Sequence, residues 1–213
     1  MSSISIIGLG NMARVLGARA LAGGNSVEFI GRDAAKAAAL ADALGGATVG
    51  AFGAVPAGDI VILSVPYAGA APLVSQYGDA LAGKVIVDIT NPFNRDFTGI
   101  DVPADSSNAQ QIAKAAPASA HVVKAFNTIF GHVLATHAAE DRPLDVFIAG
   151  DDAEAKARVS SFIESLALRP LDTGALSIAH WLEGAGLLMM RVAAGGGVKG
   201  YDFSLGINAE PAR

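Results

Sequence analysis

Cysteine is absent from the 213 residues of this chain, which excludes disulfide bonds, thiolate metal sites and thiol catalysis. Charged residues are scarce, at 16%, whereas hydrophobic residues reach 52%, so the composition indicates a compact protein with a large buried core. The net charge is -5. A nucleic-acid partner is therefore not expected, because phosphate backbones are bound by a basic face.

The sequence pattern also lacks two kinds of apolar segment, a secretory signal region and a membrane span. No basic stretch followed by a signal-type apolar region opens the sequence, since the first strand pattern starts almost at residue 3. The most apolar stretch, residues 182–198, carries Glu183 and Arg191, whereas a membrane span needs about twenty mostly apolar residues without such interruptions. These observations predict a cytoplasmic protein with no membrane segment.

The sequence does contain a regular alternation of buried-strand and helix patterns. Strands are expected near residues 4–7, 26–30, 47–49, 59–64, 84–89, 121–124, 144–149 and 168–172. Helices are expected near residues 13–22, 34–44, 68–81, 108–115, 128–135 and 152–166, with Asp33 and Asn108 as N-caps. The alternation predicts an α/β fold, a Rossmann doubly wound, mainly parallel sheet at residues 1–172, followed by a small C-terminal helical part at 173–213.

The first turn, residues 8–13, has the pattern of a dinucleotide pyrophosphate site. Gly8 suits a tight turn, Gly10 leaves room for the pyrophosphate, and Ala13 permits close helix packing at the third position of the pattern. Free N–H groups at the start of the following helix would face the phosphates. The alternative is an ordinary glycine turn, which the strand before it and the helix after it make less favourable.

The tip of the second strand bears on the choice between NAD and NADP. An NAD-selective fold places an acid there, but Glu28 comes too early, because two more strand residues follow it. The planar guanidinium of Arg32 suits a 2′-phosphate, and Lys36 lies one helical turn further on the same face. We expect a preference for NADP(H). The alternative is that Arg32 and Lys36 are a solvated surface pair.

Two later strand exits are closed by proline and should lie at the same sheet edge. Ser64, Val65 and Pro66 follow one strand, and Asn91 and Pro92 follow the next. Ligands of open α/β sheets bind outside the carboxyl ends of the strands. These residues are therefore expected on the ribose and nicotinamide side of the cofactor.

A third exit follows residues 121–124. Asn127 can orient a nicotinamide amide or a substrate carbonyl, and Lys124 is a weaker candidate for the same task. The alternative is that Asn127 caps the next helix and Lys124 is an edge-strand charge. No clear acid/base pair is present, and a hydride acceptor with its own conjugated ring would need none.

Metal chemistry and hydrolysis have little support in the sequence. The closest histidines, His132 and His137, are five residues apart, outside the facing geometry of a helix, so no metal site is expected. No G-x-S-x-G turn accompanies Ser64 and Asp88.

The last helix pattern, residues 177–194, is apolar nearly all round. Ile178, Leu182 and Met189 share one stripe, while Trp181 and Leu188 lie off it. One domain face cannot cover so much apolar surface. We therefore expect this helix to pack against its own domain and against a second copy in a homodimer.

Several motifs together resemble one family, the coenzyme F420-dependent NADP oxidoreductases. They are the segments 8–12, 31–32, 65–67, 88–92 and 123–128, the last reading Val-Lys-Ala-Phe-Asn-Thr. The cytoplasmic reductase domain of membrane ferric reductases is similar in the Ala-Phe-Asn part of that segment. The resemblance implies a dimeric Rossmann protein that moves a hydride between NADP(H) and F420.

The resemblance also implies roles for individual residues. It assigns the pyrophosphate to Leu9, Gly10, Asn11 and Met12, the 2′-phosphate to Gly31, Arg32 and Lys36, and the ribose and nicotinamide to Val65, Pro66, Asn91 and Ala125. Gly31 departs from the family pattern, in which Ser or Thr would reach the phosphate, and this loss of a hydroxyl would weaken NADP binding without reversing the preference.

Three functions remain open at this point. The first is hydride transfer between NADPH and F420. The second is an NADPH-dependent reductase of flavin, ferric chelate or a small carbonyl or imine. The third is a non-catalytic NADP(H)-sensing module. In either enzyme, residues 95–107 and 200–207 would build a second ligand pocket over the nicotinamide.

Overall fold

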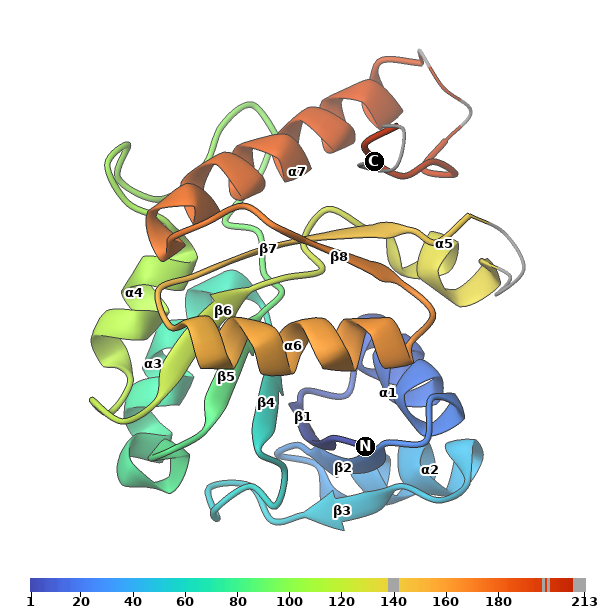
Figure 1. The fold of residues 1–213 in the computed structure, drawn as a ribbon, viewed down its shortest axis with the longest axis vertical. Coiled ribbons are helices and arrows are strands. Elements are labelled where there is room, and N and C mark those ends of the chain that lie inside the picture. Colours follow the sequence, from blue (N-terminus) through green and yellow to red (C-terminus); the bar gives the residue numbers. More distant parts are fainter. Residues whose placement is uncertain (138–141, 197, 199, 209–213) are drawn as a thin grey trace, which may run out of the picture.

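The protein is described by a computed structural model, which covers residues 1–137, 142–196, 198 and 200–208. Eight strands form one sheet in the order β3-β2-β1-β4-β5-β6-β7-β8 (Figure 1). Neighbouring strands run parallel except β6 and β7, which are antiparallel. The strands are β1 (Ser3–Ile7), β2 (Ser26–Ile30), β3 (Thr48–Gly50), β4 (Ile60–Leu63), β5 (Val85–Asp88), β6 (His121–Lys124), β7 (Asp145–Gly150) and β8 (Arg169–Asp172).

Helices cover both faces of the sheet, because the central strands are apolar on both sides. Along β4, Ile60 and Ile62 face one core, while Val61 and Leu63 face the other. The first core is covered by α1 (Asn11–Ala22), α2 (Ala34–Leu44), α5 (Gly131–Thr136) and α6 (Ala153–Ser165). The second is covered by α3 (Tyr67–Tyr77) and α4 (Asn108–Ala115). The predicted Rossmann-type α/β fold is confirmed.

The order of strands reverses at β1, where the chain passes from β3 back across the sheet to β4. Ligands of such sheets bind outside the carboxyl ends of the strands at this switch point. The glycine turn after β1 and the proline-closed exit of β4 are therefore placed together by the topology. Both lie at the same edge of the sheet.

The C-terminal part begins with a 3-10 turn, η2 (Leu176–Ile178), and continues as α7 (Ala179–Ala194), so the helix starts two residues later than the expected 177. Helix α7 runs along the top of the view in Figure 1. Leu182 packs on Phe147 and Ala149 of β7. Residues 197, 199 and 209–213 of the expected 173–213 segment lie outside the described residues. Within the described part of the chain, no helix is long and apolar enough to cross a membrane.

Two local expectations are wrong. Ser107, and not Asn108, is the N-cap of α4, since its hydroxyl accepts a hydrogen bond from the Gln110 amide at 3.1 Å. The helix after β6 begins at Gly131 and not near 128, because the exit turn extends to Phe130, which has extended backbone and is the N-cap of α5. By contrast, the predicted cap of α2 is confirmed, because the Asp33 carboxylate accepts from the Lys36 amide at 2.9 Å.

Candidate functional site

A cavity of about 680 Å³ opens at the switch point, above the carboxyl ends of β1, β2 and β4. It brings together nine of the residues that the sequence assigns to the cofactor. These are Gly8, Leu9, Gly10, Gly31, Arg32, Lys36, Ser64, Val65 and Pro66. The cavity is thus lined by three separate strand exits.

The two positions of the first turn, 8 and 10, are occupied by glycine for different structural reasons. Gly8 has a φ of 123°, and a Cβ there would overlap the carbonyl oxygen of Ser64, so only glycine fits. Gly10 instead borders open space, with nothing within 4 Å of the position of a Cβ. It is the N-cap of α1, and no side chain caps that helix start. A phosphate at this place would meet free N–H groups and the positive end of the helix dipole.

The cationic end of the cavity is formed by Arg32 and Lys36. Both side chains are exposed, and neither makes an ion pair with any residue that the structure describes. The guanidinium of Arg32 lies over the ring of Phe52, with its central carbon 5.6 Å from the ring centroid. Glu28 is engaged elsewhere, because its carboxylate accepts from the Ala57 amide at 2.9 Å. The acid at the strand tip is Asp33, which also lines the cavity, and its Oδ1 is engaged as the cap of α2 through the Lys36 amide at 2.9 Å.

The structure gives a reason for the departure at Gly31. A Cβ at this position would overlap the side chain of Leu9. A serine or threonine would fit only if Leu9 moved. The hydroxyl that the family pattern has at this place is therefore replaced by a close apolar contact between the first turn and the β2 tip.

A second, smaller cavity of about 230 Å³ lies between the exits of β5 and β6, the start of α1 and helix α7. Among the residues that line it, none has a titratable side chain. They are Met12, Ile89, Asn91, Phe93, Phe126, Asn127, Thr128, Ile129, Phe130, Gly131, Gly186, Met189 and Met190. The structure thus separates the predicted site residues into two cavities, and the turn of residues 8–12 contributes residues to both.

Asn91 and Asn127 hold each other in the wall of this smaller cavity. The Asn127 side-chain amide donates to Asn91 Oδ1 at 2.9 Å and to the Leu182 carbonyl at 2.8 Å, and Asn91 donates to the Asn127 carbonyl at 2.8 Å. Asn127 Oδ1 is buried and has no partner among the described residues. The alternative in which Asn127 caps α5 is therefore wrong. Its free oxygen instead offers an acceptor to an N–H donor.

Three predicted residues line neither cavity. Pro92 and Ala125 are buried in the protein. Asn11 is exposed at the start of α1, and its amide lies where a Cβ on Gly131 would approach it within 2.8 Å. These residues shape the turns around the site. Within the described residues, no group of three metal-ligating side chains is present.

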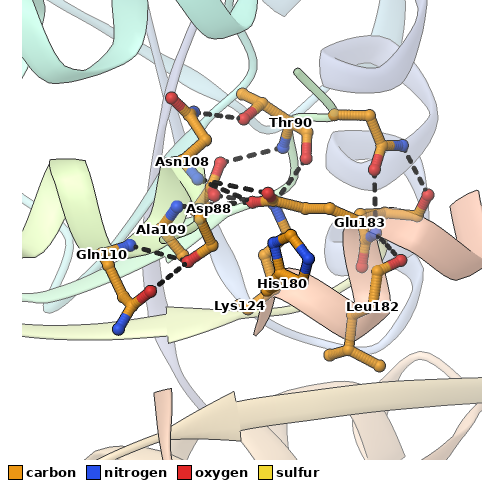
Figure 2. Close-up of polar contacts among 12 residues, drawn as sticks. Asp88, Thr90, Asn108, Ala109, Gln110, Lys124, His180, Leu182 and Glu183 are labelled. Atoms are coloured by element: carbon orange, nitrogen blue, oxygen red, sulfur yellow. Dashed lines mark hydrogen bonds and ion pairs between the residues drawn. The ribbon is translucent and has the colours of Figure 1, made fainter. Parts of the chain in front are cut away.

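Behind the smaller cavity lies a buried charge cluster, formed by Asp88, Lys124 and Glu183 (Figure 2). Lys124 Nζ is 2.8 Å from Asp88 Oδ2 and 3.0 Å from Glu183 Oε1, and the side chains of all three residues are fully buried. Lys124 Nζ donates its third hydrogen bond to the Thr90 carbonyl at 2.5 Å. The reading of Lys124 as an edge-strand charge is wrong, because β6 lies between β5 and β7.

Glu183 also connects α7 to the N-terminus of α4. Its carboxylate accepts from the backbone amides of Asn108 at 3.0 Å and Ala109 at 3.4 Å. Burial raises the pKa of the Glu183 carboxyl above its usual value, although Lys124 acts in the opposite direction. This role of Glu183 was not predicted from the sequence. The signal was a single acid within an apolar helix, matched by a single lysine within an apolar strand.

Removing the cation of this cluster should be strongly destabilising. In Lys124→Met, Asp88 and Glu183 would remain buried without a counter-ion, and we expect the free energy of unfolding to fall by about 3–5 kcal/mol. Urea unfolding followed by circular dichroism measures this. The matched control is Lys84→Met. Lys84 Nζ lies 4.0 Å from Oδ1 of Asp59, whose side chain is largely exposed, so the free energy of unfolding should fall by at most about 1 kcal/mol. Equal losses in the two variants would contradict this account.

Comparisons with known proteins find relatives among the reductases. Residues 3–92 match the family model described as NADP oxidoreductase, coenzyme F420-dependent. The chain is 33% identical to Metalloreductase STEAP3 of Rattus norvegicus, over 88% of this chain and 37% of that protein. It is 31% identical to the F420-dependent NADP reductase of Methanocaldococcus jannaschii, over 59% of this chain and 58% of that protein. It thus spans less than two thirds of either relative's length.

A solved structure from Arthrobacter sp. FB24, provisionally described as an F420-dependent NADP reductase, covers 98% of this chain and 100% of its own. Its TM-score is 0.85 at 24% identity, which shows a shared fold. The resemblance that the motifs indicate is therefore confirmed: residues 3–92 match the coenzyme F420-dependent NADP oxidoreductase family, and both curated relatives are reductases.

Proposed function

We propose that this chain is an NADP(H)-dependent oxidoreductase that transfers a hydride between NADP(H) and a conjugated ring, with coenzyme F420 as the first candidate. The observation that carries the proposal is the pair of neighbouring cavities at the carboxyl edge of the sheet, both bordered by the turn of residues 8–12. The larger has the uncapped start of α1 and two cations, Arg32 and Lys36, without an ion-pair partner among the described residues. The smaller has a buried, unpartnered amide oxygen on Asn127.

The larger cavity fits the adenosine and phosphate end of NADP(H). The open space at Gly10 and the uncapped start of α1 would receive the pyrophosphate. Arg32 and Lys36 would hold the 2′-phosphate, since a guanidinium can donate two parallel hydrogen bonds to phosphate oxygens. Glu28 is engaged with Ser5 and Ala57, and Asp33 with the cap of α2, so the two cations are the groups left to bind a 2′-phosphate.

The smaller cavity fits the nicotinamide end. Asn127 Oδ1 would accept a hydrogen bond from the carboxamide, and Asn91 fixes the orientation of the Asn127 side chain. Bound NADPH would supply a hydride from C4 of the nicotinamide. The apolar walls around these two amides, including Phe93 and Met189, would exclude water.

The walls of the smaller cavity favour a conjugated ring as the partner. Reduction of a carbonyl or an imine generally calls for a proton donor at the new alcohol or amine, and none of the lining side chains is titratable. A deazaflavin or flavin spreads the incoming charge over its ring and can take its proton from solvent. Aromatic and thioether side chains such as Phe130 and Met190 suit such a flat ring.

The metalloreductase relative favours a second candidate, reduction of a ferric chelate. A hydride carries two electrons, whereas a ferric ion accepts one. A flavin between the two would solve this mismatch, so the same cavity would again hold a conjugated ring. The two candidates differ in what receives the electrons last, not in the immediate acceptor.

The two segments expected to build the second ligand pocket each contact a residue that lines the smaller cavity. Phe93 lines it and packs edge-on against Phe97, with ring centroids 5.9 Å apart. Tyr201 and Phe203 pack edge-on against Phe130, at centroid distances of 5.3 and 5.4 Å. Residues 95–107 and 200–207 would thus form its outer wall.

Residues 1–172 would form the NADP(H)-binding domain, and residues 173–213 a dimerisation and second-ligand segment. On α7, Trp181 is 70% exposed and Leu188 64% exposed, while Leu182 faces the core. Such large apolar side chains on one helix favour a second copy of this chain as partner. A cytoplasmic location, where NADP(H) is kept available, fits the same proposal.

The cofactor preference can be measured by comparing dissociation constants for NADPH and NADH through nicotinamide fluorescence. The wild type should bind NADPH more tightly, and Arg32→Ala should weaken NADPH binding by about 10- to 100-fold, equivalent to about 1.4–2.8 kcal/mol, with little effect on NADH. Arg158→Ala is the control, because Arg158 lies at the amino end of β4 beside Asp59. Equal affinities of the wild type for both cofactors would refute the assignment.

The acceptor can be identified by following absorbance in mixtures of the protein and NADPH with oxidised F420, FMN or a ferric chelate. We expect turnover with F420 or FMN and none with a simple ketone. Turnover of ferric chelate only when FMN is present would select the metalloreductase candidate. Tight NADPH binding without turnover of any acceptor would identify a sensing module and contradict the proposal.

The dimer can be tested by light scattering at micromolar concentration. The wild type should have the mass of two chains, and Leu188→Glu should have the mass of one, because a buried carboxylate would face an apolar partner surface. Val55→Glu is the matched control, since Val55 is 67% exposed in a loop away from α7. A monomeric wild type would refute this part of the proposal.

A further inference from the structure

Lys124 and Asn127 stand three residues apart at the exit of β6, and each bridges the same two segments. One segment is the exit of β5, and the other is helix α7. Lys124 donates to the Thr90 carbonyl and to the Glu183 carboxylate. The buried charge cluster therefore spans the same gap as the proposed nicotinamide-binding amide.

The partners of Asn127 are the immediate chain neighbours of those of Lys124. Asn127 donates to Asn91, which follows Thr90, and to the carbonyl of Leu182, which precedes Glu183. Consecutive Cα atoms are 3.8 Å apart across a trans peptide, so a shift at one residue of each pair moves the next. The position of the Asn127 side chain thus depends on the geometry that Lys124 imposes.

The backbone amide, the carbonyl and the side-chain hydroxyl of Thr90 are all held by hydrogen bonds. Its amide donates to Asp88 Oδ1 at 2.9 Å, its carbonyl accepts from Lys124, and its hydroxyl accepts from the Asn108 side chain at 2.7 Å (Figure 2). Hydrogen bonds to buried charged groups are among the strongest in proteins. The peptide that leads into Asn91 therefore has little freedom.

On the other side, Glu183 fixes α7 one turn before the helix meets the cavity. A Cβ at Gly186 would lie 2.8 Å from Asn91 Oδ1, so the backbone of α7 rests directly on Asn91. Met189 and Met190, on the following turn, line the cavity. Loss of the link to Glu183 would let this wall of the cavity move away from the amide pair.

We propose that Lys124 is a positioning residue for the nicotinamide end of the cofactor site. With Asp88 and Glu183, it sets the separation between the β5 exit and α7, and thereby fixes the Asn127 side chain in the wall of the smaller cavity. This inference rests on the proposed binding of NADP(H) and adds a residue that does not touch the cofactor.

The test uses two ligands that share the adenosine end. The probe 2′,5′-ADP carries the 2′-phosphate and one 5′-phosphate but no nicotinamide, so the ratio of its dissociation constant to that of NADPH reports the nicotinamide end alone. In the wild type we expect this ratio to be about ten or more, so that the nicotinamide end contributes at least about 1.4 kcal/mol of binding free energy. Calorimetry gives both constants without any acceptor.

The main variant combines Lys124→Met, Asp88→Asn and Glu183→Gln. It removes the cation and both carboxylates together, so no unpaired buried charge remains and the fold should persist. We expect the dissociation constant of 2′,5′-ADP to stay unchanged and that of NADPH to rise, so that the ratio of the two constants falls to about one. The binding free energy of NADPH would then be weaker by about 1.4 kcal/mol. The single variant Glu183→Gln, in which Lys124 and Asp88 remain, should keep at least half of the wild-type ratio. Lys156→Met, which breaks the exposed pair with Asp172, is the control.

Each outcome decides the question. A folded triple variant that keeps the wild-type ratio would overturn the inference, because the nicotinamide end would then be aimed without the cluster. A parallel loss of 2′,5′-ADP and NADPH binding would also overturn it and leave the cluster a purely structural role. If the wild type bound neither ligand, the proposed function itself would fail, which these measurements distinguish from failure of the inference.

Discussion

A lysine that has no contact with water must find all its hydrogen-bond partners inside the protein, and much of this site depends on how Lys124 does so. Its three donors meet two carboxylates and one carbonyl, contributed by two other parts of the chain. An ion set of this kind does little for net stability, since desolvation offsets the attraction. It is geometrically demanding, however, because any displacement leaves a charge unsatisfied.

This constraint complements the one that the sheet imposes. The strand order places the glycine turn, the β2 tip and the β4 exit around one cavity, and this arrangement needs only parallel pairing and the reversal at β1. The smaller cavity needs more, because one wall comes from α7, which is remote in sequence. The sheet therefore builds the phosphate end of the site. The buried charge cluster completes the other end.

The sequence predicts the first of these two constructions well. Apolar runs such as 60–63 and the pattern of residues 8–13 depend on local spacing, so the doubly wound sheet and the grouping of the first turn with Arg32 follow from general rules. The second was not predictable, because the pairing of Lys124 with Glu183 joins residues far apart along the chain. A single sequence marks each as a charge in apolar surroundings but does not say which partner satisfies it. The cap of α4 was missed by one residue, since Ser107 and Asn108 are both good caps.

The contact between Leu9 and Gly31 joins the two halves of the phosphate site. Because the leucine side chain occupies the space of a Cβ on residue 31, the two positions form one unit in which the size of one side chain limits the other. A hydroxyl at position 31 would require Leu9 to move or to be replaced by a smaller side chain. The addition of a hydroxyl to this phosphate site is therefore coupled to the conformation of Leu9, and a substitution at position 31 would be disfavoured by steric overlap as long as Leu9 keeps its present position.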